Sequence, residues 1–517
     1  MTVLSRAAVG DGWARRRPPG RPRATAPRRT LLAVCLAVVL ARLPSVWQPL
    51  RNDEGGYLLA ARHWHAGGEF LYGDLFVDRP PLLLAIFRVA ALSGWDGAIR
   101  LLAIPFAVVF VVAAWHAGAR LGGPAGARWA AVVGAGLVCS PALAADQADG
   151  ELFATVLVMA SVACALAAWA AGSPGRAAAV GALAGALAAG ALLVKQSALE
   201  GVVVVAVLVA VGAWRGGPAR RRALALAASA GAGALLATAA ALVPLVASGT
   251  DAGTLWRDLV GMRGDALDVI WSARPHATLV RAGQLVALTV VTGLAGAVAT
   301  WCWAAGRDRA LRRSAEGLAV LAMVPAGLAA MVAGGSFWPS YALQLAPVAA
   351  LSVGALAGRR DRAGTWARRW GRVVVVTAVV AAVGATVVYA TVPRVWFQQR
   401  IGEWLAASAE PGDTAVVAYG HPSILAAADL TTPYPYLWSV PMRTLDGDQA
   451  LLRATLAGPD APAWLVAVNG WNSWGIDDDG RLRDLLADRY RVVAQVCGRP
   501  VLLREDLQRS LAPPVRC

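Results

Sequence analysis

Long apolar segments recur along the chain and constrain its fold more than any other feature. They are about 20 residues long, carry few charges and are separated by short polar connections. A helix of about 20 residues crosses the hydrocarbon core of a bilayer, which is about 30 Å thick. Because 57% of the 517 residues are hydrophobic and only 15% are charged, we predict a polytopic α-helical membrane protein.

The positive charge lies mainly in the short connections between the apolar segments. The formal net charge is +16, and almost all of it comes from arginine, since Lys195 is the single lysine. Arginine-rich connections mark the cytoplasmic side of a membrane protein. We therefore expect membrane lipids as partners and no nucleic acid.

Alternation of these arginine loops predicts about eleven spans, with the N-terminus in the cytoplasm of a plasma membrane protein and the C-terminus outside. The expected spans are Leu31–Val46, Leu101–Ala119, Trp129–Ala145, Leu152–Ala171, Ala177–Val194, Ala198–Ala213, Ala223–Val246, Ala282–Trp303, Gly317–Ala333, Tyr341–Leu356 and Val373–Val392. Leu82–Ser93 is too short to cross the core, and a crossing there would put the arginine loop 120–128 outside. We expect a re-entrant or interfacial helix at this segment, and a large external loop over about Ser248–Thr278.

Both ends of the chain differ in composition from the apolar middle, which we expect to form a membrane domain over residues 30–393. Residues 1–29 are rich in Arg and Pro and predict a disordered cytoplasmic tail. Residues 394–517 alternate strand and helix patterns, which predicts a small extracytoplasmic α/β domain with roughly half of its strand pairs parallel. The expected elements are strands at Asp413–Tyr419, Ala463–Val468, Val492–Val496 and Val501–Leu503, and a helix at Leu482–Tyr490.

Cys497 and Cys517 are the two cysteines that lie outside the apolar segments. The region that holds them is predicted to be extracytoplasmic, where disulfides persist. We expect them to form a disulfide, with two unpaired thiols as the alternative. No cysteine spacing indicates a zinc site.

Carboxylates gather in the predicted external loop 49–81. The loop opens with Asp53-Glu54-Gly55-Gly56-Tyr57 and closes with Asp78-Arg79-Pro80-Pro81. A solvated loop is the ordinary explanation, but the predicted topology brings further ionisable residues to the same side: Asp146, Asp149, Glu151, Lys195 and His276. Ionisable groups at a membrane boundary that face a bundle interior are functional candidates.

These motifs resemble the GT-C glycosyltransferases, specifically the relatives of protein mannosyltransferases and of the lipid A aminoarabinose transferase (glycosyltransferase family 39 type). The resemblance covers residues 30 to 360 and is carried by NDEGGY at 52–57, RPP at 79–81, ADGE at 148–151, LVKQS at 193–197 and SYALQLAP at 340–347. The chain departs from the family in having Arg79 where relatives often carry Lys, and Ser340 where they often carry His. The resemblance implies a GT-C fold and an enzyme that transfers a hexosyl or pentosyl group from a polyprenyl-phosphate-linked donor to an extracytoplasmic glycan, lipid or protein.

The resemblance also implies roles for individual residues. Asp53 would be the catalytic base, with Glu54 as its neighbour or substitute and Asp149 as a second carboxylate. The donor phosphate would be held by Lys195, Arg79 and Tyr341. Contacts to the acceptor or the sugar are expected from Tyr57, Asp146, Glu151 and His276. Asp53 and Asp149 would hold a divalent metal (Mg²⁺ or Mn²⁺), or Asp149 would orient the acceptor; the residues leave both open, and no other cofactor is expected.

Other interpretations of these residues stay open at this point. Asp53 is a preferred residue type for a plain helix cap, and Lys195 is placed where an interfacial lysine snorkels. The main alternative function is a transporter of a lipid-linked or small polar substrate. Such a protein is expected to carry charges at the membrane midplane and to have repeated halves, and the sequence shows neither.

Overall fold

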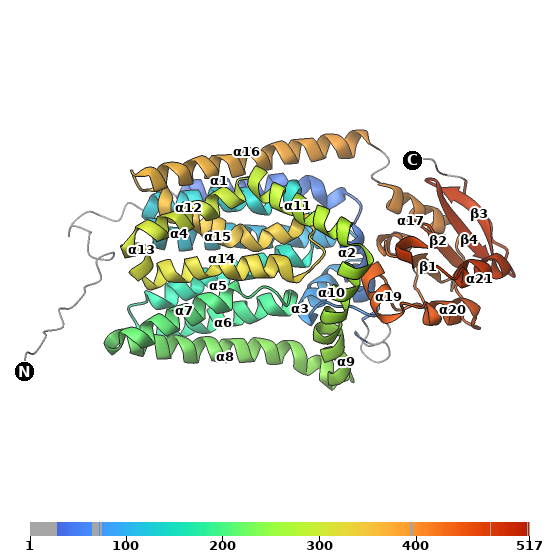
Figure 1. Cartoon of the computed structure of the whole chain (residues 1–517), viewed down its shortest axis with the longest axis horizontal. Helices are drawn as coiled ribbons and strands as arrows, with labels where there is room; N and C mark the ends of the chain where they lie inside the picture. Colours follow the sequence, from blue (N-terminus) through green and yellow to red (C-terminus); the bar gives the residue numbers. More distant parts are fainter. Residues whose placement is uncertain are drawn as a thin grey trace, which may run out of the picture.

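A bundle of long apolar helices makes up most of the molecule, and a small domain with a β-sheet covers one end of it (Figure 1). This computed structural model describes residues 28–64, 72, 75–392, 396–475, 477–513, 515 and 517. Nearly all of the predicted tail 1–29 lies outside the described residues, as does part of the predicted external loop.

The apolar segments of the sequence form the helices of the bundle. Their bounds are α1 Arg28–Arg42 with the 3-10 turn η1 Leu43–Trp47, α4 Ala98–Val138, η2 Pro141–Leu143, α5 Gly150–Trp169, α6 Pro174–Val194, α7 Glu200–Arg215, α8 Gly217–Ala247, α11 Pro275–Val291, α12 Leu294–Arg307, α13 Arg309–Arg313, α14 Ala315–Ala333, η4 Pro339–Leu345, α15 Ala346–Ala357 and α16 Arg362–Thr391. Among the described residues, eight helices are long and apolar enough to cross a membrane, or nine if α11 and α12, bent by 71°, form one span.

Helix α4 contains two of the predicted spans. Its 41 residues are interrupted at Gly123, whose φ of 65° and ψ of −155° are not helical. A Cβ on Gly118 would lie only 2.5 Å from the carbonyl oxygen of Gly126, so the two halves fold back on each other as a tight hairpin. The second half of α4 and α7, whose 16 residues measure about 24 Å, correspond to two further predicted spans. The structure therefore has a helix at each of the predicted spans.

Several short helices lie at the end of the bundle next to the C-terminal domain (Figure 1). They are α2 Asn52–Arg62, α3 Pro81–Ala91, α9 Ala252–Trp256, the π-helical turn η3 Arg257–Gly261 and α10 Met262–Ala273. Helix α3 has 11 residues and is about 16 Å long, too short to cross a membrane, as predicted. The segment predicted as a loop over 248–278 is instead largely helical, because Met262, Ala266 and Ile270 recur at helical spacing and are buried along one face of α10.

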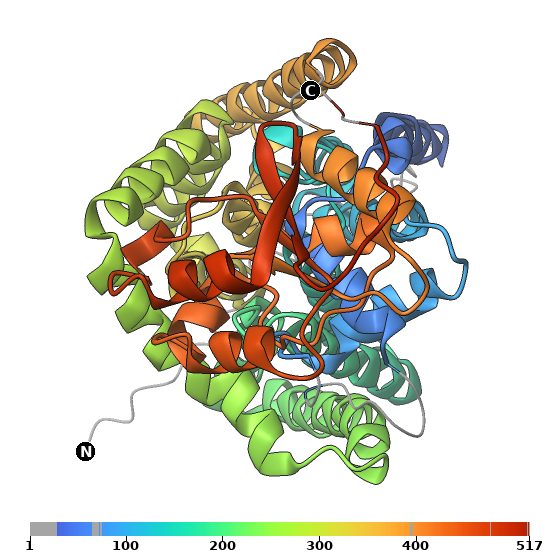
Figure 2. The same cartoon turned by 90° about the vertical axis from the view of Figure 1, so that its right-hand side faces the viewer.

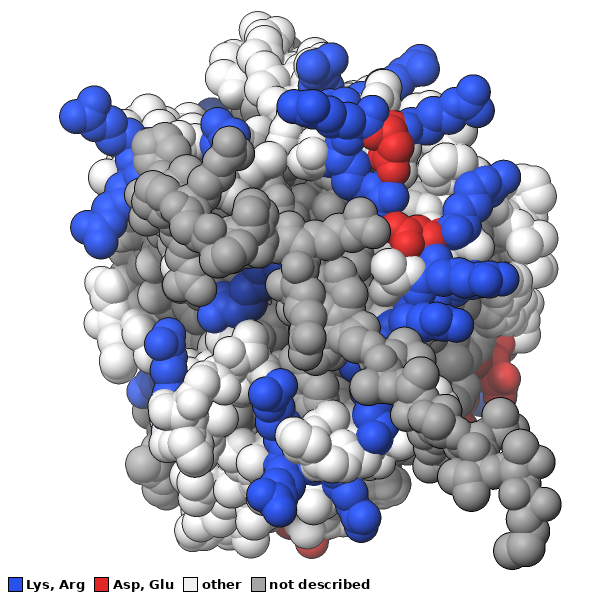
Figure 3. Space-filling model, turned by 90° about the vertical axis from the view of Figure 1, so that its left-hand side faces the viewer, with Lys and Arg blue, Asp and Glu red and all other residues white. Residues whose placement is uncertain are grey.

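The opposite end of the bundle is rich in arginine, and we call it the arginine face. Figure 3 shows basic side chains spread across this face with few acidic ones. Exposed arginines lie in the connections at this end, among them Arg128, Arg176, Arg215, Arg309, Arg312, Arg313, Arg360 and Arg362. Two aspartates here, Asp308 and Asp361, pair with Arg359.

The C-terminal domain has a four-stranded sheet in the order β1-β2-β4-β3. Its elements are α17 Phe397–Ser408, β1 Ala415–Ala418, α18 Ser423–Ala428, α19 Ser439–Leu445, α20 Ala450–Ala457, β2 Trp464–Ala467, η6 Ser473–Gly475, α21 Arg481–Arg489, β3 Tyr490–Val496 and β4 Arg499–Arg504. Only β1 and β2 pair in parallel, one pair of three rather than half, because the tight turn between β3 and β4 forms a hairpin. In Figure 2 the domain lies in front of the centre of the bundle end.

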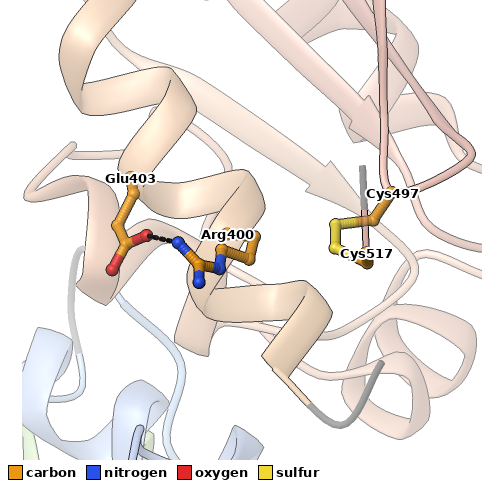
Figure 4. The surroundings of a disulfide bond; sticks show 4 residues. All are labelled: Arg400, Glu403, Cys497 and Cys517. Atoms are coloured by element: carbon orange, nitrogen blue, oxygen red, sulfur yellow. Dashed lines mark hydrogen bonds and ion pairs between the residues drawn. A yellow bond between two sulfur atoms is a disulfide. The ribbon is translucent and has the colours of Figure 1, made fainter. Parts of the chain in front are cut away.

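Cys497, at the turn between β3 and β4, forms a disulfide with Cys517, and their Cα atoms are 5.0 Å apart. Figure 4 shows this bond beside α17, which carries the ion pair of Arg400 and Glu403. The bond ties the end of the chain to the sheet.

Candidate active site

The first turn of α2 carries the adjacent carboxylates Asp53 and Glu54. Arg51 is the residue before the helix, with extended backbone, and its N–H donates to Glu54 Oε2 at 2.9 Å. Neighbouring side chains leave an α-helix about 100° apart. The two carboxylates therefore enter different surroundings.

Glu54 is fully buried and is bound to the framework of the bundle. Arg100 of α4 donates from Nε to Oε1 at 2.7 Å and from Nη2 to Oε2 at 2.6 Å, and the N–H of Ala148 donates to Oε1 at 2.8 Å. With the Arg51 bond, the carboxylate accepts four hydrogen bonds, which is about its full capacity. Burial alone would raise the pKa of Glu54, and Arg100 with these bonds brings it below its usual value. Glu54 is thus engaged in joining α2 to α4, and we do not assign it the role of a substitute base.

Arg100 completes this framework through backbone oxygens. It donates to the carbonyl groups of Ser45, Gln48 and Pro49. Asp146, expected near the acceptor, lies on this side of α2, where the hydroxyl of Tyr389 donates to it at 3.4 Å and Arg100 is a charged neighbour. The structure does not bring Asp146 to the cluster around Asp53 that we describe next.

Asp53 points away from this framework and keeps part of its surface exposed. Its Oδ1 accepts a hydrogen bond from the indole Nε1 of Trp438 at 3.0 Å, and no described residue donates to its Oδ2. Burial raises the pKa of Asp53 to about 6, against the opposing effects of Arg79 and of the Trp438 hydrogen bond. The side chain does not cap α2, so the plain helix-cap interpretation fails.

A second acidic pair and the single lysine lie beside Asp53. Glu151 and Lys195 form a buried ion pair, and the Lys195 ammonium lies 4.4 Å from the ring centre of Tyr341. Asp149 is buried and caps α5 by accepting from Leu152 N–H at 3.1 Å. Burial and then the neighbouring Glu151 raise the pKa of Asp149 well above its usual value. Lys195, only 7% exposed, does not snorkel.

Arg79 brings a second cation to the same place. It donates to Asp78 at 2.9 Å and lies 5.9 Å above the ring of Tyr57. Asp78 is also paired at 3.1 Å with Arg263 of α10. The Nε of Arg79 is buried and has no hydrogen-bond partner among the described residues. A buried donor without a partner is costly, so this atom is suited to an anionic ligand.

Most of the expected site residues meet here, at the bundle end below the C-terminal domain. They are Asp53, Tyr57, Arg79, Asp149, Glu151, Lys195 and Tyr341. His276 is exposed at the first turn of α11, and no contact joins it to the cluster in the described part of the chain.

The divalent metal stays a prediction, and the arrangement of the described residues does not favour it. Among these residues, no group of three or more Asp, Glu, His or Cys side chains could hold a metal ion. Asp149 already caps the N-terminus of α5, and Glu151 already forms an ion pair with Lys195. Arg79 and Lys195 already supply positive charge here through their ion pairs with Asp78 and Glu151.

Sequence reasoning missed the contribution of the C-terminal domain. Trp438 lies 385 positions from Asp53 and belongs to no motif. Arg263 and Gln196 donate to the backbone oxygen of Asp78. Arg263 lies in the segment predicted as a large external loop and Gln196 in the LVKQS motif, but their common partner does not follow from the sequence, because these contacts join segments that are distant in the chain.

No family model and no curated protein matches this chain. Among solved structures, the crystal structure of ArnT from Cupriavidus metallidurans bound to undecaprenyl phosphate is similar, with a TM-score of 0.60 and 16% identity over 95% of this chain and 100% of that one. The same protein in the apo state has a TM-score of 0.54 and 14% identity over 92% and 98%. At these identities the likeness establishes the fold. The chain is a polytopic membrane protein with the GT-C fold that its motifs resemble.

Proposed function

We propose that this protein is a membrane glycosyltransferase that moves a sugar from a polyprenyl-phosphate-linked donor to a hydroxyl acceptor outside the cytoplasm. One observation carries the proposal. A partly exposed carboxylate with a raised pKa, Asp53, lies at the bundle end beside the cations Arg79 and Lys195. The GT-C fold, shared with a protein crystallised with undecaprenyl phosphate, supports a lipid-linked donor.

Asp53 is suited to act as the general base. Its Oδ2 takes the proton of the acceptor hydroxyl as the acceptor oxygen bonds to the anomeric carbon of the sugar. The bond between that carbon and the phosphate oxygen breaks, and the electron pair leaves with the polyprenyl phosphate. A base with a pKa of about 6 is largely ionised at neutral pH and is stronger than an ordinary aspartate, which favours proton transfer.

Arg79 and Lys195 are suited to stabilise the departing phosphate. The Nε of Arg79 has no partner among the described residues. Lys195 has three donors, of which Glu151 accepts one and Tyr341 faces the ammonium with its ring. Positive charge aimed at a developing anion in a site that excludes water lowers the barrier.

The arginine face supports a sidedness in which that face and the N-terminus are cytoplasmic. The C-terminal domain and the site then face outward. A transporter is less well supported, because Asp53 lies on α2 and Arg79 just before α3, and both helices lie at one end of the bundle (Figure 1) rather than at its middle.

The test is donor cleavage by purified protein, measured as release of polyprenyl phosphate from a panel of polyprenyl-phosphate sugars. Asp53→Asn is expected to lower turnover about 10²- to 10⁴-fold. The matched control is Asp265→Asn, the same change at an exposed residue of α10. In the wild type, kcat/KM is expected to fall as the pH drops through about 6, since protonated Asp53 cannot accept a proton. Wild-type turnover by Asp53→Asn would reject the assignment.

A further inference from the structure

The C-terminal domain packs against the two glycines that follow Asp53-Glu54. A Cβ on Gly55 would lie 2.5 Å from the Cα of Ser423, and a Cβ on Gly56 would overlap the indole of Trp438. Neither glycine has a positive φ, so their small size is what the structure uses. They allow α2 and the domain to approach more closely than any other residue would.

Trp438 is held firmly at this contact. It is the residue before α19, and its carbonyl oxygen accepts from Met442 N–H at 3.2 Å, which closes the first turn of that helix. Its ring packs against Tyr57 of α2, with centres 5.3 Å apart and planes tilted by 41°. Backbone and ring together set the direction of the indole N–H.

That N–H is directed at Asp53, with Nε1 and Oδ1 3.0 Å apart. The terminal torsion of an aspartate has a broad, shallow preference, so a carboxylate without a partner rotates. A bond to Oδ1 stops this rotation and leaves Oδ2 directed away from the indole. An indole is a neutral group that donates only, so it orients the carboxylate without adding a full positive charge.

We propose that Trp438 is a positioning residue for Asp53, so that the C-terminal domain forms part of the active site. This inference rests on the proposed function, since it takes Asp53 as the base. The domain then has a specific role in the reaction, because it presents the indole N–H that fixes which oxygen of the base meets the acceptor.

Other charged or titratable groups also act on Asp53, and the experiment has to separate them from Trp438. They are Arg79 and Asp78 from the segment before α3, Asp149 at the N-cap of α5, Glu151 from α5 with its partner Lys195 at the end of α6, Tyr57 from α2 and Tyr341 from η4. Substitution of Trp438 leaves all of these side chains in place. A change in the pH profile of such a variant therefore reports on the indole.

The experiment compares Trp438→Phe with the wild type in the donor-cleavage assay across a pH series. Phe keeps an aromatic ring against Tyr57 and removes the N–H donor together with one ring of the indole, so Gly56→Ala below, which leaves the indole intact, is the complementary variant. We expect kcat to fall about 10- to 100-fold, since misplacement of a reacting group by about 1 Å costs this much, with the KM for the donor nearly unchanged. The acid limb should move up by about one pH unit, because the ionised carboxylate loses a hydrogen bond.

The matched control is Trp464→Phe. Trp464 also donates its indole N–H to an aspartate of the same domain, Asp413, at 2.9 Å, but it lies in β2 and packs against Trp404 of α17. This variant should keep the wild-type kcat and acid limb. If Trp438→Phe also keeps both while Asp53→Asn is inactive, the positioning role is wrong and the proposed function stands. If Asp53→Asn is active, the proposed function fails first.

Gly56→Ala provides a second test if Trp438→Phe does not fold. The added methyl group displaces the indole without changing it, so the same upward shift of the acid limb is expected. Gly231→Ala in α8, where a Cβ would meet open space, is its control. An unchanged acid limb in Gly56→Ala would overturn the inference.

Discussion

Glu54→Gln tests whether the two adjacent carboxylates of α2 really have different roles. Glu54 is completely buried, and its partner Arg100 is 2% exposed. The substitution keeps the shape of the side chain but replaces an oxygen that accepts hydrogen bonds by an NH₂ group. In either orientation that group must face a donor of Arg100, together with the N–H of Ala148 or of Arg51. Arg100 is also left as a buried charge without its counterion.

Breaking a buried ion pair by removing one partner costs about 3–5 kcal/mol. This is a large share of the about 5–15 kcal/mol by which typical domains are stable. Arg100 keeps its three bonds to carbonyl oxygens, which favours the lower end of the range. Glu54→Gln is therefore expected to lower the Tm clearly, whereas Asp53→Asn, at a partly exposed group with one hydrogen bond, should change the Tm little.

The assay is thermal unfolding in detergent micelles, combined with turnover per folded molecule. We expect Glu54→Gln to lose stability while its folded fraction retains most of its turnover, the reverse of Asp53→Asn. The double variant Glu54→Leu/Arg100→Met should be more stable than Glu54→Leu alone, since it removes the unpaired charge. A Glu54→Gln protein with wild-type Tm and about 10²-fold less turnover would show that Glu54 takes part in the chemistry, and the reasoning would be refuted.

Three further predictions concern donor binding, the disulfide and sidedness. Lys195→Ala should weaken binding of a polyprenyl-phosphate sugar, and Lys195→Arg should retain part of it; equal affinities in all three proteins would limit Lys195 to its ion pair with Glu151. Mass spectrometry of non-reduced, alkylated protein should find Cys497 and Cys517 joined, a bond that closes a loop of about 20 residues and contributes on the order of 3 kcal/mol; two alkylated thiols would contradict this. In intact cells an impermeant thiol reagent should label Ala407→Cys of α17 and spare Gly306→Cys near the arginine face, and the opposite pattern would invert the topology.

The local sequence was sufficient to predict where the membrane spans lie and how they alternate. The lipid core admits only segments that are long and apolar enough and satisfy their own backbone hydrogen bonds, so each span is visible in its own residues. Arginine placement gave the alternation of the spans, and the shortness of Leu82–Ser93 excluded a crossing at α3. Strands β1 and β2 of the C-terminal domain were also predictable locally, because each is a continuous buried run.

Only the tertiary structure decided which carboxylate of the site has which role. Asp53 and Glu54 are adjacent carboxylates in one motif, and what separates them is the partner that each meets: Trp438 for one and Arg100 for the other. Asp146 likewise lies near Arg100 rather than near Asp53, because of the segments that pack around it. A sequence pattern reports where a side chain lies along its own helix. It does not report which distant segment packs against that face, and the chemistry of a buried carboxylate is set by that segment.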